Sequence, residues 1–154
     1  MSTANEKRIV ASNKKAFFNY EIQDRFEAGI VLEGYEVKSI RHGHVTFQDC
    51  YARASETAIV LMGLYIRPYA MAHHVVINPT RDRKLLLHKS ELKKFAYKTA
   101  TKELVLVPLS IYFKGNKLKV ELGLGKPKKK FDKRASLKEK DVKREIDRGM
   151  KRFN

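Results

Sequence analysis

Cysteine, tryptophan and long apolar runs are scarce or missing in this chain of 154 residues. The single cysteine, Cys50, excludes an internal disulfide framework and fits a reducing compartment. The longest apolar run, residues 58–66, has nine residues, whereas a membrane-spanning helix needs about 20. No apolar stretch follows the charged N-terminal residues, so we expect no signal peptide. These absences predict a soluble, cytoplasmic protein with no membrane partner.

Residues that form catalytic or metal sites are few and scattered. The five histidines have no cysteine or carboxylate at ligand spacing; they are His42, His44, His73, His74 and His88. Cys50 lies in a strand pattern without a supporting base, so we interpret it as a small core residue. The carboxylates occur singly, which provides no pair for general acid and base catalysis. We therefore expect a binding protein without catalytic residues, metal site or cofactor.

Lysine and arginine are abundant: 33 basic residues outnumber 17 acidic ones, giving a formal net charge of +16. The charge is unevenly spread, because residues 126–154 carry +8, residues 13–125 carry +7 and residues 1–12 carry +1. We predict a flexible N-terminal segment (1–12), a compact basic domain (13–125) and a basic tail (126–154). The natural partner of this distribution is nucleic acid. An acidic membrane surface is the alternative, but the tail has only scattered apolar residues to anchor it.

The sequence of the domain predicts mostly β-strands. Strand-like apolar patterns occupy five segments: 18–22, 26–32, 49–54, 58–66 and 84–87. A hairpin follows over 104–113 and 118–124, with Gly115-Asn116 supplying positive φ in its turn and Pro108 at an edge or a bulge. Helical spacing predicts short helices over 34–41 and 89–98. The predicted fold class is therefore mainly β: a small closed antiparallel barrel of the oligonucleotide-binding type, with flanking short helices.

The sequence of the tail predicts a helix with a narrow apolar stripe. Ser136 and Glu139 have the spacing of a capping box, and Val142, Ile146 and Met150 follow at intervals of four residues. A stripe one residue wide stabilises a lone helix poorly in water. We therefore predict a tail that is disordered when free and helical on its target. The alternative is a helix docked on the barrel through the same three apolar residues.

Three clusters in the domain predict a phosphate-contacting surface. They are the run Asn13-Lys14-Lys15, the pair Lys38 and Arg41 on one helix face, and the run Arg81-Asp82-Arg83-Lys84. Each alone also fits ordinary solvated charge; on one barrel they favour contact with nucleic acid. The nearby aromatics Phe17, Tyr35 and Tyr51 fit either base stacking or the core.

Six strings in order resemble the SsrA-binding protein family, also called small protein B. They lie at residues 13–16 (NKKA), 26–30 (FEAGI), 34–39 (GYEVKS), 78–87 (NPTRDRKLLL), 120–124 (VELGL) and 132–134 (DKR). The resemblance covers about residues 13–150. It implies an oligonucleotide-binding-type barrel that binds the tRNA-like domain of transfer-messenger RNA. It further implies delivery of this RNA to the empty A site of stalled ribosomes in trans-translation, without enzymatic activity.

The resemblance also implies particular residues. It places Asn13, Glu27, Lys38 and Arg41 on or near the RNA-facing surface. The basic clusters complete this candidate set with Lys14, Lys15, Arg81, Arg83 and Lys84. In the tail, the resemblance implies a helix in the vacant mRNA channel of the small subunit, next to the decoding centre. The candidate ribosome-contacting residues are Lys128, Lys129, Lys130, Phe131, Asp132, Lys133, Arg134, Val142, Ile146 and Met150.

Two other readings use the same residues. The first is a ribosomal or assembly protein that barrel and tail hold permanently on ribosomal RNA. The fraction of ribosomes that carry the protein discriminates it from a monomeric delivery factor, which should leave most ribosomes unoccupied. An RNA-modifying enzyme is the second, and the lack of a catalytic constellation in the sequence argues against it.

Overall fold

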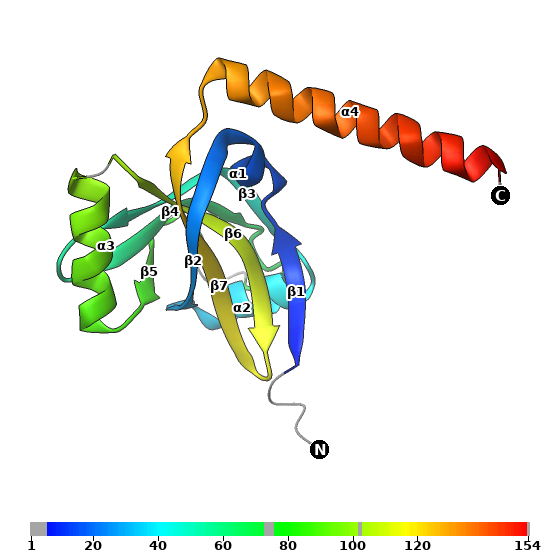
Figure 1. Ribbon diagram of the computed structural model, residues 1–154. Coiled ribbons are helices and arrows are strands. Elements are labelled where there is room, and N and C mark those ends of the chain that lie inside the picture. The colour runs from blue at the N-terminus through cyan, green and yellow to red at the C-terminus, as the bar shows by residue number, and fades with distance from the viewer. Residues whose placement is uncertain (1–5, 73–75, 102, 154) are drawn as a thin grey trace.

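The computed structural model describes residues 6–72, 76–101 and 103–153, and within the last helix it describes the side chains of Arg134 and residues 137–148. Strands make up most of the domain, with short helices between them (Figure 1). In chain order the elements are β1 Lys7–Ser12, α1 Lys14–Asn19, β2 Tyr20–Ile30, α2 Gly34–Arg41, β3 Val45–Ala54, β4 Ile59–Ile66, β5 Arg83–Leu86, α3 Lys89–Thr101, β6 Val105–Lys114, β7 Lys117–Pro127 and α4 Lys130–Phe153.

Strands β2 to β7 close into an antiparallel barrel. The order along the sheet is β1-β6-β3-β4-β5-β2-β7, and β6 also pairs with β7, which joins the ends of the ring. β1 lies outside the ring and pairs with the second half of β6, whereas β3 pairs with its first half. The predicted fold class, a mainly β closed barrel with short helices, is therefore confirmed.

Local sequence patterns predicted the hairpin β6–β7 and the helix α2 at the correct positions. In the hairpin β6–β7, Lys114 pairs with Lys117 across a turn in which Gly115, but not Asn116, has positive φ (62°). Pro108, which has no N–H, lies beside a register shift in this pairing, as expected of a proline within a sheet. The helix α2 begins at Gly34 and ends at Arg41, the bounds that its spacing predicted.

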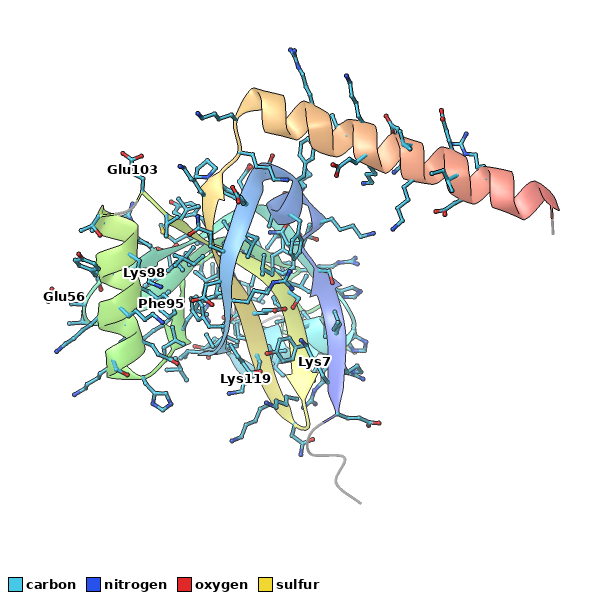
Figure 2. All side chains as sticks on the ribbon, viewed as in Figure 1. Lys7, Glu56, Phe95, Lys98, Glu103 and Lys119 are labelled. Atoms are coloured by element: carbon cyan, nitrogen blue, oxygen red, sulfur yellow. The ribbon has the colours of Figure 1, made fainter. Side chains whose placement is uncertain are left out.

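The core fills the barrel from alternating strand positions and is closed by helices. Leu61, Ile111 and Leu122 are fully buried inside. At one side α3 buries Phe95, whose ring stacks on Phe26 with centroids 3.8 Å apart (Figures 1 and 2). In the part of the chain that is described, no helix is long and apolar enough to cross a membrane.

The tail forms one helix, α4, which leaves the barrel after β7 and extends away from it (Figure 1). Its root is tied to α1, because the Lys128 N–H donates to the Asn19 carbonyl over 2.9 Å. Farther along, Val142 is 55% and Ile146 53% exposed. The docked-helix alternative is therefore wrong for these two residues, and the side chain of Met150 lies outside the described residues. Disorder of the free tail stays a prediction.

The structure differs from the sequence prediction at the N-terminal end. Residues 7–12, expected to be flexible, form β1, and residues 14–19 form the helix α1, although the strand-like pattern was expected to begin at residue 18. The segments 18–22 and 26–32 belong largely to one long strand, β2, with a register shift between Ile22 and Asp24. The pairing of β1 with the free edge of β6 supplies the hydrogen bonds that its own sequence does not signal.

Candidate nucleic-acid interface

A buried ion cluster holds α2 on the barrel. Glu36 of α2 is 2% exposed, and its carboxylate accepts hydrogen bonds from the Glu33 N–H, from Arg81 and from Arg83. Burial alone would raise the pKa of this carboxyl, but the bonds from Arg81, Glu33 and Arg83 outweigh burial and hold the pKa below its ordinary value. Glu36 therefore serves both as helix cap and as anchor for two arginines.

Arg83 was predicted to face RNA, and its position contradicts this. Its side chain is fully buried, with Nε 2.7 Å from Glu36 Oε2, Nη1 2.5 Å from the Leu64 carbonyl and Nη2 3.0 Å from the Pro79 carbonyl. These bonds join α2, β4 and the segment before β5. A buried charge needs such partners, so Arg83 supports the fold, and its side chain presents no atom at the surface.

The neighbours of Arg83 are reachable from solvent. Lys84 points outward from β5, and Arg81 is 31% exposed while bound to Glu36. On α2, Lys38 and Arg41 share the exposed face, because Glu36, Ser39 and Ile40 occupy the buried one. Lys38 Nζ lies 5.4 Å from the centre of the Tyr69 ring, and Arg41 lines a cleft with Arg8 and Phe113. This end of the barrel therefore carries several accessible cations.

Asn13, Lys14 and Lys15 lie at the other end of the barrel. Asn13 is fixed to the bulge of β6, since its N–H donates to the Leu109 carbonyl (2.7 Å) and its Nδ2 to the Pro108 carbonyl (2.9 Å). Lys14 and Lys15 are exposed on the first turn of α1. Asn13 thus positions two lysines that solvent or a ligand can reach.

Glu27 lies between the two ends, on the outer face of β2. The Tyr112 hydroxyl donates to its carboxylate, and Lys114 Nζ lies 3.7 Å from its other oxygen. Burial, together with Glu27, raises the pKa of Tyr112. Lys7 of β1 lies 4.2 Å from the centre of the Tyr112 ring. The carboxylate of Glu27 is therefore already engaged by one hydroxyl and one lysine of the same chain.

The predicted residues thus form two groups instead of one surface. Figure 1 shows α1 and α2 at opposite ends of the barrel, joined by β2. Lys38, Arg41, Arg81 and Lys84 gather at the α2 end, and Asn13, Lys14 and Lys15 gather at the α1 end. Of the tail set, Arg134, Val142 and Ile146 are exposed on α4 and Lys129 precedes it. The side chains of Lys130, Phe131, Asp132, Lys133 and Met150 lie outside the described residues.

Two further features were missed from the sequence. Lysines line the outer side of α3, at Lys89, Lys93 and Lys94. Their spacing in the sequence could have indicated a shared helix face, but no motif drew attention to it. A pocket beside α1 is lined by Tyr51, Arg53 and Lys15, and it depends on strand geometry that no local pattern signals. Within the described residues, no group of three or more His, Cys, Asp or Glu side chains is placed to hold a metal ion.

Comparisons with known proteins agree with one family along nearly the whole chain. The sequence profile of the family described as "SmpB protein" matches residues 10–152. The SsrA-binding protein of Syntrophobacter fumaroxidans is 48% identical over 151 residues, which cover 98% of this chain and 94% of that protein. The SsrA-binding protein of Orientia tsutsugamushi is 50% identical over 145 residues, 94% of this chain and 95% of that protein.

A solved structure gives the same result. A chain from the structure described as "tmRNA-SmpB: a journey to the center of the bacterial ribosome" superposes with a TM-score of 0.65 at 45% sequence identity. The match covers 78% of this chain and 85% of that one. The similarity therefore extends to the fold as well as the sequence.

Proposed function

The chain belongs to the SmpB protein family, and on this premise we propose that it binds the tRNA-like domain of transfer-messenger RNA and delivers it to the A site of stalled ribosomes. The observation that carries the proposal is the match with SsrA-binding proteins over 98% of the chain, barrel and tail together. The chain acts by binding, and we propose no catalytic role for it.

The arrangement of charge supports a protein that binds RNA at both ends of the barrel. Lys38 and Arg41 at the α2 end and Lys14 and Lys15 at the α1 end are exposed cations on short rigid helices. Phosphate contacts of this kind fix a protein on folded RNA without reading its sequence. A barrel with two cationic ends can bind one RNA at one end and contact a second RNA at the other. A delivery factor needs these two simultaneous contacts.

We further propose that the tail senses the vacant mRNA channel. Residues 126–154 carry a charge of +8, and beyond its root α4 extends away from the barrel with Val142 and Ile146 exposed. A cationic helix gains free energy in an RNA-lined channel through counterion release, provided that mRNA does not occupy it. The string Asp132-Lys133-Arg134 would then act after delivery, during accommodation and tagging.

An RNA-binding titration tests the main proposal. The purified chain should bind the tRNA-like domain at least about tenfold more tightly than a random oligonucleotide of equal length; equal affinities would contradict it. The double variant Lys38→Gln, Arg41→Gln should weaken this binding. The slope of log K against log salt concentration should become shallower by about 0.7–0.9 for each lost phosphate contact. The matched control, Lys93→Gln with Lys94→Gln on α3, removes equal charge and should change less.

The tail proposal needs a separate readout. Removing residues 130–154 keeps all of β7 and should leave RNA binding near normal, but should flatten the salt dependence of ribosome binding. Asp132→Ala with Lys133→Ala should abolish peptide tagging with RNA affinity unchanged. Ribosome binding that keeps its salt slope without α4 would show that the tail contacts no phosphates. Stable occupancy of most translating ribosomes would instead favour a ribosomal protein.

A further inference from the structure

A pocket of about 570 Å³ opens at the α1 end of the barrel, between α1, β3 and the start of β6. Its interior is formed by buried apolar residues, among them Ala16, Leu106 and Val107. Its size lies in the range of sites that bind small organic groups, which are about 300–1,000 Å³. The volume and the apolar interior together fit a flat ring system.

The pocket exists because β3 diverges from β6. In the described residues, Ala52 and Leu106 form the single paired position between these strands. On its other side β3 shifts register against β4 between Phe47 and Tyr51, and Asp49 within this shift has φ 47°. A non-glycine residue rarely adopts this left-handed conformation. The irregular strand leaves a gap that α1 and the end of α3 border without filling.

The polar groups of the pocket are suited to a nucleotide. Tyr51 is 43% exposed, and Arg53 lies on the same face of β3, two residues farther along. Lys15 lies on the α1 side of the mouth and is exposed. Asn19 also lines the pocket, and its side chain has no hydrogen-bond partner among the described residues. An aromatic face, two cations and an unpaired amide match a base, its phosphate and its polar edge, and the exposed carboxylate of Asp49, which also lines the pocket, can accept from a base amino group.

We propose that this pocket receives one unstacked nucleobase of a bound RNA, with the base against Tyr51 and its phosphate near Lys15 and Arg53. The proposal rests on the proposed function for the presence of RNA. The location supports it, because Asn19 lines the pocket and also accepts the Lys128 N–H at the root of the tail. RNA that meets the tail therefore comes close to the mouth of the pocket.

Replacing Tyr51 tests the stacking. Tyr51→Ser should weaken binding to the tRNA-like RNA or to the ribosome by about 5- to 150-fold, the range expected from losing one stacked base. Tyr51→Phe keeps the ring and should bind within about twofold of the wild type. The matched control, Tyr97→Ser on α3, removes a ring that is 64% exposed and should change neither affinity. The complex that weakens identifies which RNA supplies the base.

Salt dependence separates stacking from charge. Tyr51→Ser should lower affinity equally at all salt concentrations, because a stacked ring releases no counterions, whereas Lys15→Gln should flatten the slope by about 0.7–0.9. Unchanged melting temperatures would show that both variants fold. Wild-type affinity of Tyr51→Ser for both ligands would overturn the proposal. So would a photocrosslinker in place of Tyr51 that attaches to a ribosomal protein and not to RNA.

Free nucleotides test the pocket independently of transfer-messenger RNA. Millimolar adenosine 5′-monophosphate should shift the amide NMR signals of Tyr51 and Asn19 in the full chain, while ribose 5-phosphate should shift only signals near Lys15 and Arg53. Equal shifts with both compounds would mean an anion site and would overturn the proposal. If nucleotide binds but the tRNA-like RNA is not preferred, the proposed function fails while the pocket stands.

Discussion

Replacing Arg83 with methionine would remove the buried cation that joins α2 to the barrel. The wild-type guanidinium lies 2.6 Å from Glu36 Oε2 at its nearest atom and within 3.0 Å of the Leu64 and Pro79 carbonyls, and it is fully buried. Removing one partner of a buried pair costs about 3–5 kcal/mol, and we expect the lower part of this range because Glu36 keeps its bond to the partly exposed Arg81. At an unfolding slope of about 2 kcal/mol per molar urea, the midpoint should fall by roughly 2 M.

Two comparisons test the reasoning behind this number. Arg81→Met removes a side chain that is 31% exposed and also binds Glu36, so it should cost only about 1 kcal/mol. Glu36→Met combined with Arg83→Met should cost at least about 2 kcal/mol less than the sum of the two single changes, because neither charge is then left alone. A cost below 1 kcal/mol for Arg83→Met, or strict additivity, would refute the argument.

The same variant decides whether Arg83 contacts RNA. If Arg83 only supports α2, folded Arg83→Met should bind RNA more weakly at every salt concentration without a change in slope. A phosphate contact would instead make the slope shallower by about 0.7–0.9, as we expect for Arg41→Gln. Measuring both variants at several salt concentrations therefore separates support from contact.

The contribution of Glu36 to stability should also depend on pH. Its pKa lies below the unfolded value of about 4.3, so its ionised form stabilises the fold fully above that value. The contribution is lost as pH falls through the lower pKa of the folded state. The stability difference between wild type and Glu36→Gln should therefore be largest near pH 7 and shrink toward pH 3, as urea unfolding at each pH would show.

Two further predictions concern the irregular strand. Gly63→Ala should destabilise the protein by about 2 kcal/mol or more in urea unfolding, because Gly63 has φ 82° and a Cβ there would lie 2.8 Å from the Asp49 carbonyl oxygen. Gly34→Ala, which meets nothing within 4 Å, should stay within about 0.5 kcal/mol. Burial raises the pKa of Cys50 to about 12, so its alkylation at pH 8 should be at least about 100-fold slower in the folded than in the unfolded chain, and similar rates would contradict this.

The sequence was most informative where the signal is local. The bounds of α2 followed from its helical spacing, and the hairpin followed from Gly115 and the alternation on both sides. The strand β1 could not be predicted in this way. Its register is set by the edge of β6, where Lys7 pairs with Lys114 and lies over Tyr112. Such pairings join residues about 100 positions apart, and a local pattern does not carry them.

The error at Arg83 arose from treating a run of charges as one surface. Strand alternation separates this run: Arg83 and Leu85 point into the barrel, at 0% and 2% exposure, while Lys84 and Leu86 point outward. The alternation of inward and outward positions along β5 was present in the sequence. If we had applied it to the charged residues, it would have assigned Arg83 to the interior. The partner of Arg83 could not be predicted in this way, because Glu36 lies 47 residues away and reaches Arg83 only when α2 packs on the barrel. The accessible cations of this cluster are therefore Arg81 and Lys84, and the position of α2 beside them depends on a buried arginine.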